Sequence, residues 1–593
     1  MSYQNIKIED LPLLHNNNKT EFQISINRSK IQPLKQQGKS TVLSKADQVF
    51  EEIANLEGAH YGSIFGQRSF ASLQRINDSN HQANSKWQQT IYEDEQNNSL
   101  IQDFWIVLKL AVPPVISMFF QFFVQLINTY YIGHLNDQVI MAGIGMGNML
   151  INILCFAVTQ GLNSALETFI SQSFGATNYS YCGVLLNRGR LIVSVFLIPI
   201  ILIFVVSDKL LIYIGQDAQI AEISKQFSLM MMPGIWAMTQ FDVIRKYMIA
   251  QRQNTIPVYI QFFTMILHFG WCHLFISVYE WSVFGAALAT NITYLLNLII
   301  IDHVLAKSQK FQFTRAPLDR SIFQEWSEYL RIGIPGAFML CFEWWAFEFL
   351  AIFSGYISVA SLAAEIVIIN IVSFIFMMPL GISYAASSLT GYYVGQGNIK
   401  RAKRFAFVIM LLNIILTIFV LALIVIFNEQ ISRLFTHEEE IVEIVNKVLW
   451  IIVIYIFFDT IHGVQSGIIK GIGKQTYSSI FLLICYYCFG MPLALVFAFK
   501  LQMEVSGLWL GFTIASMILD VGFYFIINCT QWELAGKDMR KRSMTSEIQR
   551  IEMAKSIQAS KHGNDELSQP KIFSKQLNSI DGQRMSQKSK YKL

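Results

Sequence analysis

Apolar runs of about 20 residues alternate with short polar breaks along the middle of the chain, from Phe104 to Cys529. A helix needs about 20 predominantly apolar residues to cross a hydrocarbon core roughly 30 Å thick. The pattern therefore predicts an all-α membrane protein with twelve transmembrane helices. We place them at residues 104–132, 138–174, 179–206, 219–250, 256–279, 283–306, 329–354, 360–396, 402–427, 441–470, 476–499 and 505–529.

The composition agrees with this prediction. Hydrophobic residues make up 53% and charged residues 15% of the 593-residue chain, and the mean hydropathy is +0.40. These values are typical of a membrane protein with many spans. We divide the chain into an N-terminal tail (1–100), a first lobe of six helices (101–306), a linker (307–328), a second lobe of six helices (329–532) and a basic C-terminal tail (533–593). The first tail has no signal-peptide pattern, and its polar composition predicts disorder.

Charge alternates between the breaks. One set of breaks is basic and contains Arg188, Arg252, the linker and the cluster at 400–404, whereas the other set is acidic at Asp137 and 438–440. Basic breaks face the cytosol. The alternation therefore predicts two cytosolic termini, in the plasma membrane or in a vacuolar or other internal membrane.

The two lobes resemble each other when the chain is aligned with itself so that Pro113 meets Pro335. This shift spans six helices, an even number, and so gives both lobes the same orientation, as in parallel repeats related by an axis along the membrane normal. Two such lobes around a central cavity indicate a transporter that works by alternating access. The other matching pairs are Gly133 and Gly355, Ala142 and Ala364, Asn148 and Asn370, Thr168 and Thr390, and Gly175 and Gly397.

Several segments carry a family resemblance. They are Gly133–Leu135 and Gly161–Ala176 in the first lobe, and Cys341–Glu348, Pro379–Ser387, Val394–Gly397 and Gly467–Gln475 in the second. On these residues the chain resembles the multidrug and toxic compound extrusion (MATE) family, in its eukaryotic branch, over residues 104–532. The resemblance implies export of organic compounds, often cations, in exchange for protons or sodium. Prokaryotic members usually have an aspartate where this chain has Asn128, so the resemblance places the coupling acids in the second lobe.

Two acids lie near the predicted midplane of the membrane. Glu343 is eleven residues from Ile332, or roughly 17 Å along a helix, and Asp459 lies about ten residues, or roughly 15 Å, from Leu449 on the opposite side. An acid at this depth is a functional-site hypothesis by default. We predict Glu343 as the main proton carrier and Asp459 as its partner, with structural hydrogen bonding as the alternative for each.

Further polar and aromatic residues are weaker candidates. Glu348 lies about 140° around the helix from Glu343, so we assign it a supporting role in structure or in substrate attraction. Trp344 and Trp345 could hold an organic cation through cation–π contacts, although helix packing is the preferred explanation. The remaining candidates, which could line the cavity or join helices by hydrogen bonds, are Gln125, Asn128, Asn148 and Asn370. Glu167 is attributed to capping or packing, and Glu365 is left unassigned.

Cysteine and histidine patterns predict no disulfide, metal or enzyme site. Cys485 and Cys488 have redox spacing but lie in an apolar run, and His268, His273 and His462 are not spaced as ligands. We expect a non-enzymatic protein with no cofactor beyond a coupling ion, H⁺ or alternatively Na⁺. The expected partners are small organic substrates, mainly cations, and membrane lipid. We expect a monomer and no nucleic-acid partner.

Other transport functions remain as alternatives. A flippase of lipids or lipid-linked sugars, or an organic-acid exporter, would need basic residues in the cavity, and the predicted spans are expected to offer acids rather than arginines. A channel is disfavoured because the sequence lacks a filter repeat.

Overall fold

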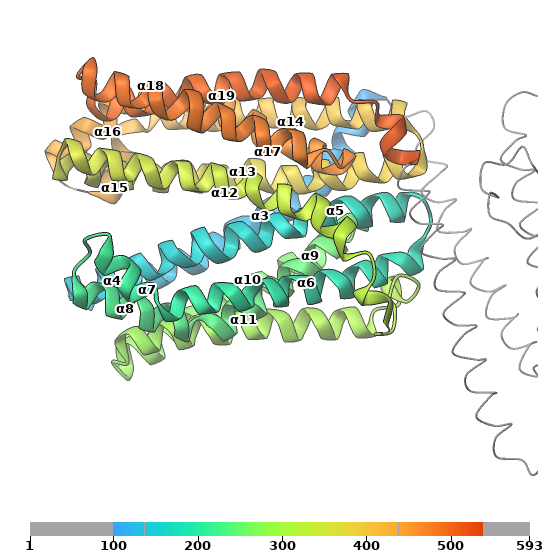
Figure 1. Cartoon of the computed structure of the whole chain (residues 1–593), viewed down its shortest axis with the longest axis horizontal. Helices are drawn as coiled ribbons and strands as arrows, with labels where there is room; N and C mark the ends of the chain where they lie inside the picture. Colours follow the sequence, from blue (N-terminus) through green and yellow to red (C-terminus); the bar gives the residue numbers. More distant parts are fainter. Residues whose placement is uncertain (1–98, 136, 319, 437, 538–593) are drawn as a thin grey trace, which may run out of the picture. The chain divides into compact units, whose positions relative to one another are not determined.

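The structure of the protein is a computed structural model that describes residues 99–135, 137–318, 320–436 and 438–537 (Figure 1). The predictions for residues 1–98 and 538–593 lie outside the described residues. Within the described part, the structure is helical throughout both lobes. Short π-helical turns interrupt or extend several helices, at 152–156, 273–278, 484–490 and 496–500.

The helices of the two lobes follow one another in chain order. The first lobe contains α3 (Leu100–Gly133), α4 (Gln138–Ile151), α5 (Ala157–Gly175), α6 (Tyr179–Val205), α7 (Ser207–Tyr213), α8 (Ala218–Met230), α9 (Met232–Ala250), α10 (Thr255–Cys272) and α11 (Ser282–Lys307). The second lobe contains α12 (Trp326–Ile357), α13 (Val359–Gln396), α14 (Ile399–Ile426), α15 (Asn428–Phe435), α16 (Glu439–Ile472), α17 (Gln475–Leu483), α18 (Met491–Leu495) and α19 (Glu504–Cys529). The linker between the lobes contributes two short 3₁₀ turns, Gln309–Phe311 and Arg320–Phe323.

Local sequence explains where many of these helices begin. Ser99 caps α3 in a reciprocal arrangement with Gln102, and the Asp137 carboxylate accepts hydrogen bonds from the first amides of α4. The Ser358 side chain likewise accepts a hydrogen bond from a first-turn amide of α13. The polar breaks read from the sequence therefore coincide with helix ends.

The predicted spans are confirmed with one difference. Eleven helices of the described residues are long and apolar enough to cross a membrane. The remaining predicted span, 219–250, forms two helices, α8 and α9, which meet at Met231 beside Pro233. It is less apolar than the others because it carries ionisable residues at Lys225, Asp242, Arg245 and Lys246. Together these spans form twelve membrane-crossing elements in two lobes.

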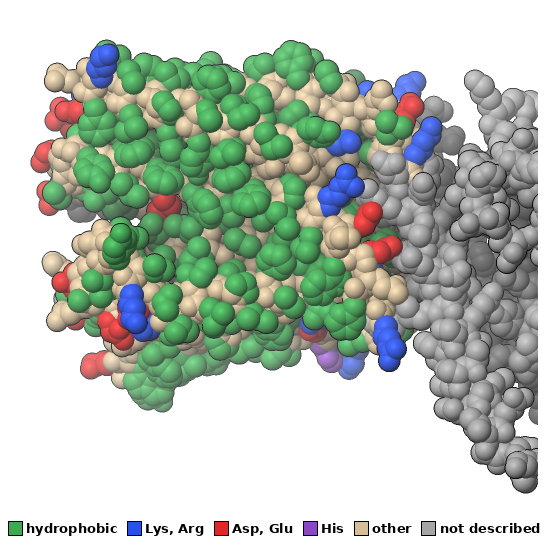
Figure 2. All heavy atoms as spheres, in the orientation of Figure 1, with side chains coloured by type: hydrophobic (Ala, Val, Ile, Leu, Met, Phe, Trp, Pro, Cys, Tyr) green, Lys and Arg blue, Asp and Glu red, His purple; other side chains and the backbone are tan. Residues whose placement is uncertain are grey.

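The surface is consistent with a membrane-embedded bundle. Figure 2 shows hydrophobic side chains covering the face in view between the two ends, while most charged side chains lie at the ends. Side chains such as Phe263, Ile299, Phe419 and Tyr524 are exposed on the helices. An apolar belt of this kind is expected of a protein whose solvent is lipid.

The lobes pack together mainly at one end, which we call the basal end. It is the end where α3 begins and where α5, α9, α13 and α16 finish. There α5 packs against α12 and α13 of the other lobe, whereas α4, the other half of the same span, packs on α8 within its own lobe. A Cβ atom at Gly395 would collide with the Gln172 carbonyl oxygen, and one at Gly175 would collide with that of Tyr392. The absence of side chains at these glycines thus permits the backbones of the two lobes to meet.

Candidate functional site: an acidic cluster in the second lobe

The two predicted acids lie together in the second lobe. Glu343 is on α12 and Asp459 is on α16, and both side chains are buried. His462, one turn after Asp459, lies between them. Its Nε2 atom is 3.2 Å from Glu343 Oε1 and 3.8 Å from Asp459 Oδ1. Glu343 and Asp459, the predicted partners, are therefore connected through the imidazole of His462.

Surrounding groups orient this cluster. The Tyr455 hydroxyl donates a 2.7 Å hydrogen bond to Asp459 Oδ1. When Glu343 is ionised it can only accept a hydrogen bond, so in that state the Nε2 atom of His462 is the donor. Asp520 on α19 is a third buried acid of this lobe, three residues before Phe523, whose ring packs against His462. Neither Asp520 oxygen has a hydrogen-bond partner within the described residues.

The sequence analysis missed two members of this cluster. The prediction that His462 is dispersed from other ligand-type residues is wrong in space, because Glu343, 119 residues earlier, is its hydrogen-bond partner. One potential ligand atom from each of Glu343, Asp459 and His462 lies within 4.8 Å of the others, which could accommodate a metal ion. The 3.2 Å contact between His462 Nε2 and Glu343 is of hydrogen-bond length, whereas the buried Nδ1 atom of His462 has no hydrogen-bond partner among the described residues. Asp520 could have been found from its position, since it is an acid deep within the last apolar run.

Internal symmetry does not extend to the acidic cluster. In the alignment that pairs Pro113 with Pro335, the residues Glu343, Asp459 and His462 correspond to Gln121, Ala237 and Gln240 of the first lobe. None of these three first-lobe side chains ionises. The repeat-related site is therefore acidic only in the second lobe.

The other predicted acids have different surroundings. Glu348 is half-buried on α12, and no hydrogen bond or ion pair of its side chain is found among the described residues. Glu365, left unassigned from sequence, is fully buried and accepts a 2.8 Å hydrogen bond from the Trp509 indole. Glu365 is thus part of the packing between α13 and α19.

The two tryptophans contact the other lobe. Trp344 packs against the hydrophobic core of the first lobe, and the Trp345 indole donates a 3.3 Å hydrogen bond to the Ile153 carbonyl oxygen. These contacts agree with the preferred packing interpretation of the pair.

The predicted amides differ in what they contact. Asn128 joins three helices: its amide donates to Thr290 at 2.9 Å, and its carbonyl oxygen lies 3.1 Å from His268 Nε2. Asn370 donates to the Ile366 carbonyl oxygen of its own helix. Gln125 and Asn148 are half-buried, and no side-chain hydrogen bond of either is found in the described ranges. Asn128 therefore stabilises the first lobe, and the structure assigns no contact with the acidic cluster to these four amides.

A second buried set of charges lies in the first lobe. Lys246 on α9 forms ion pairs with Glu167 on α5 at 2.9 Å and with Asp242 at 3.5 Å, and it donates to the Gln160 carbonyl oxygen. Arg245 pairs with Asp242, which also accepts a 2.8 Å hydrogen bond from Asn163. The attribution of Glu167 to capping or packing is incomplete, because its carboxylate is a counter-ion. The missed signal was the run of charges at 242–246 inside a predicted span.

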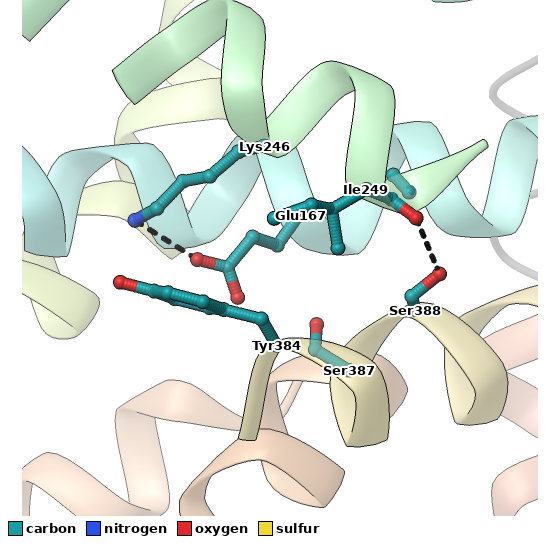
Figure 3. Close-up of a pocket in the computed structure, with 7 residues that line it drawn as sticks. Glu167, Lys246, Ile249, Tyr384, Ser387 and Ser388 are labelled. Atoms are coloured by element: carbon teal, nitrogen blue, oxygen red, sulfur yellow. Dashed lines mark hydrogen bonds and ion pairs between the residues drawn. The ribbon is translucent and has the colours of Figure 1, made fainter. Parts of the chain in front are cut away.

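This charge cluster lies beside the boundary between the lobes (Figure 3). A narrow space that does not admit a water-sized sphere is lined by Glu167, Lys246, Ile249, Ala250, Tyr384, Ser387 and Ser388. The Tyr384 ring, from the second lobe, has its centroid 5.3 Å from Lys246 Nζ. Ser388 donates a 2.9 Å hydrogen bond to the Ile249 carbonyl oxygen across the boundary.

Other polar contacts across the lobes also lie at the basal end. Gln172 donates to the Gly471 carbonyl oxygen at 2.8 Å, and Thr168 donates to that of Lys470 at 2.6 Å. Buried Asp103, in the first turn of α3, pairs with Arg401 of α14 at 2.9 Å. The structure is therefore closed at the basal end.

Comparison with known sequences matches both lobes of the internal repeat. The profile of the MatE family matches the chain twice, at residues 113–274 and 335–496, and both ends of the two ranges correspond in the alignment that pairs Pro113 with Pro335. The chain belongs to the MatE family. The resemblance and the internal repeat inferred from the sequence are both confirmed, and the protein is a membrane transporter of the MATE type.

Eukaryotic proteins are among the relatives of the chain. Multidrug and toxin extrusion protein 1 of Danio rerio is 31% identical over 437 residues, which are 73% of this chain and 73% of that protein. Protein DETOXIFICATION 14 of Arabidopsis thaliana is 29% identical over 447 residues, which are 75% of this chain and 92% of that protein. The crystal structure of the eukaryotic MATE transporter AtDTX14 superposes with a TM-score of 0.72 at 26% identity, covering 75% of this chain and all of the other.

Proposed function

We propose that this transporter exports organic compounds, chiefly cations, in exchange for protons by alternating access. The observation that carries the proposal is the cluster of Glu343, Asp459 and His462, buried together in one lobe. The names of the relatives, which are multidrug and toxin extrusion proteins, support an organic substrate. Sodium, the alternative coupling ion, would use the same carboxylates.

Burial of the carboxylates is what couples proton binding to cation binding in this proposal. An isolated carboxylate in a dry site is costly to keep ionised, so it is stabilised either by a proton or by a bound cation. In the proposal Glu343 is the main carrier and Asp459 is a second titrating group that is electrostatically coupled to it. A proton that arrives from one side displaces the organic cation, and loss of the proton to the other side restores cation binding. The exchange then requires that the site face one side at a time.

The contacts between the lobes identify the conformational state of the proposed alternating-access cycle. Hydrogen bonds and ion pairs close the basal end, where the proposal places the cytosol and both termini. The site would then open toward the outer side, where α4 and its own-lobe partner α8 lie apart from the second lobe. In the opposite state these basal contacts would break and the outer halves would approach each other.

The rival substrates, organic acids and lipid phosphates, would need a positively charged cavity. The prediction that the spans offer acids rather than arginines is wrong. Arg245 and Lys246 are both buried within the first lobe. Their charges are matched by ion pairs with Asp242 and Glu167. The second-lobe cluster has an excess of acids, which favours a cation.

The proposal is tested with the purified full chain in liposomes. An imposed pH gradient should drive tetraethylammonium movement against the proton flux, and collapse of the gradient with a protonophore should stop it. Movement driven by a sodium gradient alone would replace the coupling ion. Movement of citrate or of a fluorescent lipid, with none of tetraethylammonium, would contradict the proposed substrate class.

A further inference from the structure

His462 occupies the space that an exported cation would have to reach. Its side chain is 1% exposed, and its Nε2 atom lies within 3.8 Å of both Glu343 and Asp459. The ring of Phe523, on α19, packs at a steep angle with its centroid 6.5 Å from that of His462. The imidazole is therefore held between the two carboxylates rather than free to rotate into open space.

Acidic or phenolic groups surround this histidine on the helices that pack against it. Glu343 approaches from α12, and Asp459, which accepts a hydrogen bond from Tyr455, precedes it on α16. Asp520 lies on α19, three residues before Phe523, whose ring packs against His462. Tyr486, from the π-helical turn at 484–490, is buried in the same lobe, and its hydroxyl has no hydrogen-bond partner among the described residues. His462 is therefore the basic side chain among these acids, and a positive charge on it would compensate them.

We propose that His462 is a built-in counter-cation of the acidic cluster, which competes with the exported cation for Glu343 and Asp459 and so determines the affinity for cations. This inference rests on the proposed function and identifies a specificity-determining residue within it. An organic cation can engage both carboxylates only after the imidazole gives up its hydrogen bond to Glu343 or its charge. The described residues of the first lobe hold no equivalent counter-cation at this position, because the repeat-related residue, Gln240, is an amide that accepts a hydrogen bond from Arg190.

The sign of the charge at position 462 should therefore control cation binding. Glutamine can donate a hydrogen bond to Glu343 but cannot become positive, so His462→Gln leaves the acids more negative. Lysine places a lasting positive charge in the same region, so His462→Lys keeps the acids compensated. A role limited to packing would make both substitutions weaken binding, because both disturb the same contacts.

The experiment measures tetraethylammonium affinity of the purified full-length protein from about pH 5 to about pH 9, the range in which a histidine can change charge. At the acidic end we expect His462→Gln to bind about tenfold more tightly than the unmutated protein and with a flatter pH profile. His462→Lys should bind at least about tenfold more weakly throughout. The matched control is His268→Gln, a second buried histidine whose contacts are Asn128, Thr293 and Cys272, and it should keep the unmutated pH profile.

Two different failures can be told apart. Equal weakening by His462→Gln and His462→Lys, with tetraethylammonium binding intact in the unmutated protein, would overturn the inference and leave the proposed function standing. Binding of citrate instead of tetraethylammonium by the unmutated protein would contradict the proposed function and the cation competition together. If His268→Gln flattened the pH profile of tetraethylammonium affinity, the pH-sensitive group would lie in the first lobe, and this result would also overturn the inference.

Discussion

Glu167 and Lys246 form a 2.9 Å ion pair in the first lobe, whereas Glu343 and Asp459 of the second lobe share a single histidine. Both sets of charges are buried, and a buried charge is tolerated only when it is paired or neutralised. In the first-lobe set, two acids form ion pairs with two bases. The second-lobe set has more acids than bases, so it can accept an additional positive charge.

At the residue scale, the first prediction concerns the balanced cluster. Lys246→Met removes one cation and leaves Glu167 and Asp242 undercompensated, which should cost about 3–5 kcal/mol and lower the melting temperature in detergent. Glu167→Gln combined with Lys246→Met should recover part of the loss, because the uncompensated charge is removed as well. The control is Lys225→Met at the partly exposed pair with Asp208, which should cost less than about 1 kcal/mol. Equal melting temperatures for Lys246→Met and Lys225→Met would contradict the role of this cluster in stability.

A second residue-scale prediction concerns Asp459. Asp459→Asn keeps the hydrogen bond from Tyr455 but cannot ionise, so proton-driven exchange should be weakened less than by loss of the main carrier. Asn128→Asp should not restore a variant that lacks Glu343, because Asn128 is bound to Thr290 and His268 in the other lobe. Initial rates of exchange at equal protein density in liposomes provide the measurement. Complete loss with Asp459→Asn and mild loss with Glu343→Gln would reverse the two roles.

At the scale of elements, α5 and α13 form part of the closure between the lobes. They meet where Gly395 of α13 faces the backbone of Gln172 on α5, and hydrogen bonds from α5 continue the contact to the end of α16. Helices can approach this closely only when small residues are at the contact. The two helices are also repeat-related, so the closure lies between equivalent elements of the two lobes.

Enlarging this contact should hold the basal end open. In Gly395→Ala the added Cβ would collide with the Gln172 carbonyl oxygen, so the backbones must separate. We expect exchange to fall and a thiol reagent applied from the basal side to react faster with Ser388→Cys. The matched control is Gly145→Ala on α4, where an added Cβ would meet no heavy atom within 4 Å. Unchanged labelling and exchange in Gly395→Ala would show that this contact is not part of the closure.

Several features of the elements could be predicted from sequence because they depend on local pattern. Apolar runs separated by polar breaks located the helices to within a few residues. Counting residues from a helix end also placed Glu343 and Asp459 at similar depths. The contact of His462 with Glu343 could not be predicted in the same way, because helix packing brings together residues that are 119 positions apart. The charges of α9 were visible in the sequence, but the partner of Lys246 on α5 required the fold.

At the scale of the whole molecule, two parallel lobes of six spans require that both ends of the membrane domain lie on one side. The end of α19 and the start of α3 should therefore both be cytosolic, where the basic breaks lie. Tags placed after residue 537 and before residue 99 should be detected only after cells are permeabilised. Detection of either tag on intact cells would contradict the orientation.

The central claim is that Glu343 carries the coupling proton, and one measurement tests it most directly. Glu343→Gln retains the size of the side chain and can accept a hydrogen bond from His462, but it cannot ionise. Proton-driven tetraethylammonium exchange should be measured in liposomes for this variant and for Glu348→Gln, the matched change on the same helix. We predict that Glu343→Gln folds and inserts normally but loses nearly all exchange, while Glu348→Gln keeps a larger share. Near-normal exchange by Glu343→Gln would contradict this claim and remove the residue from the coupling mechanism.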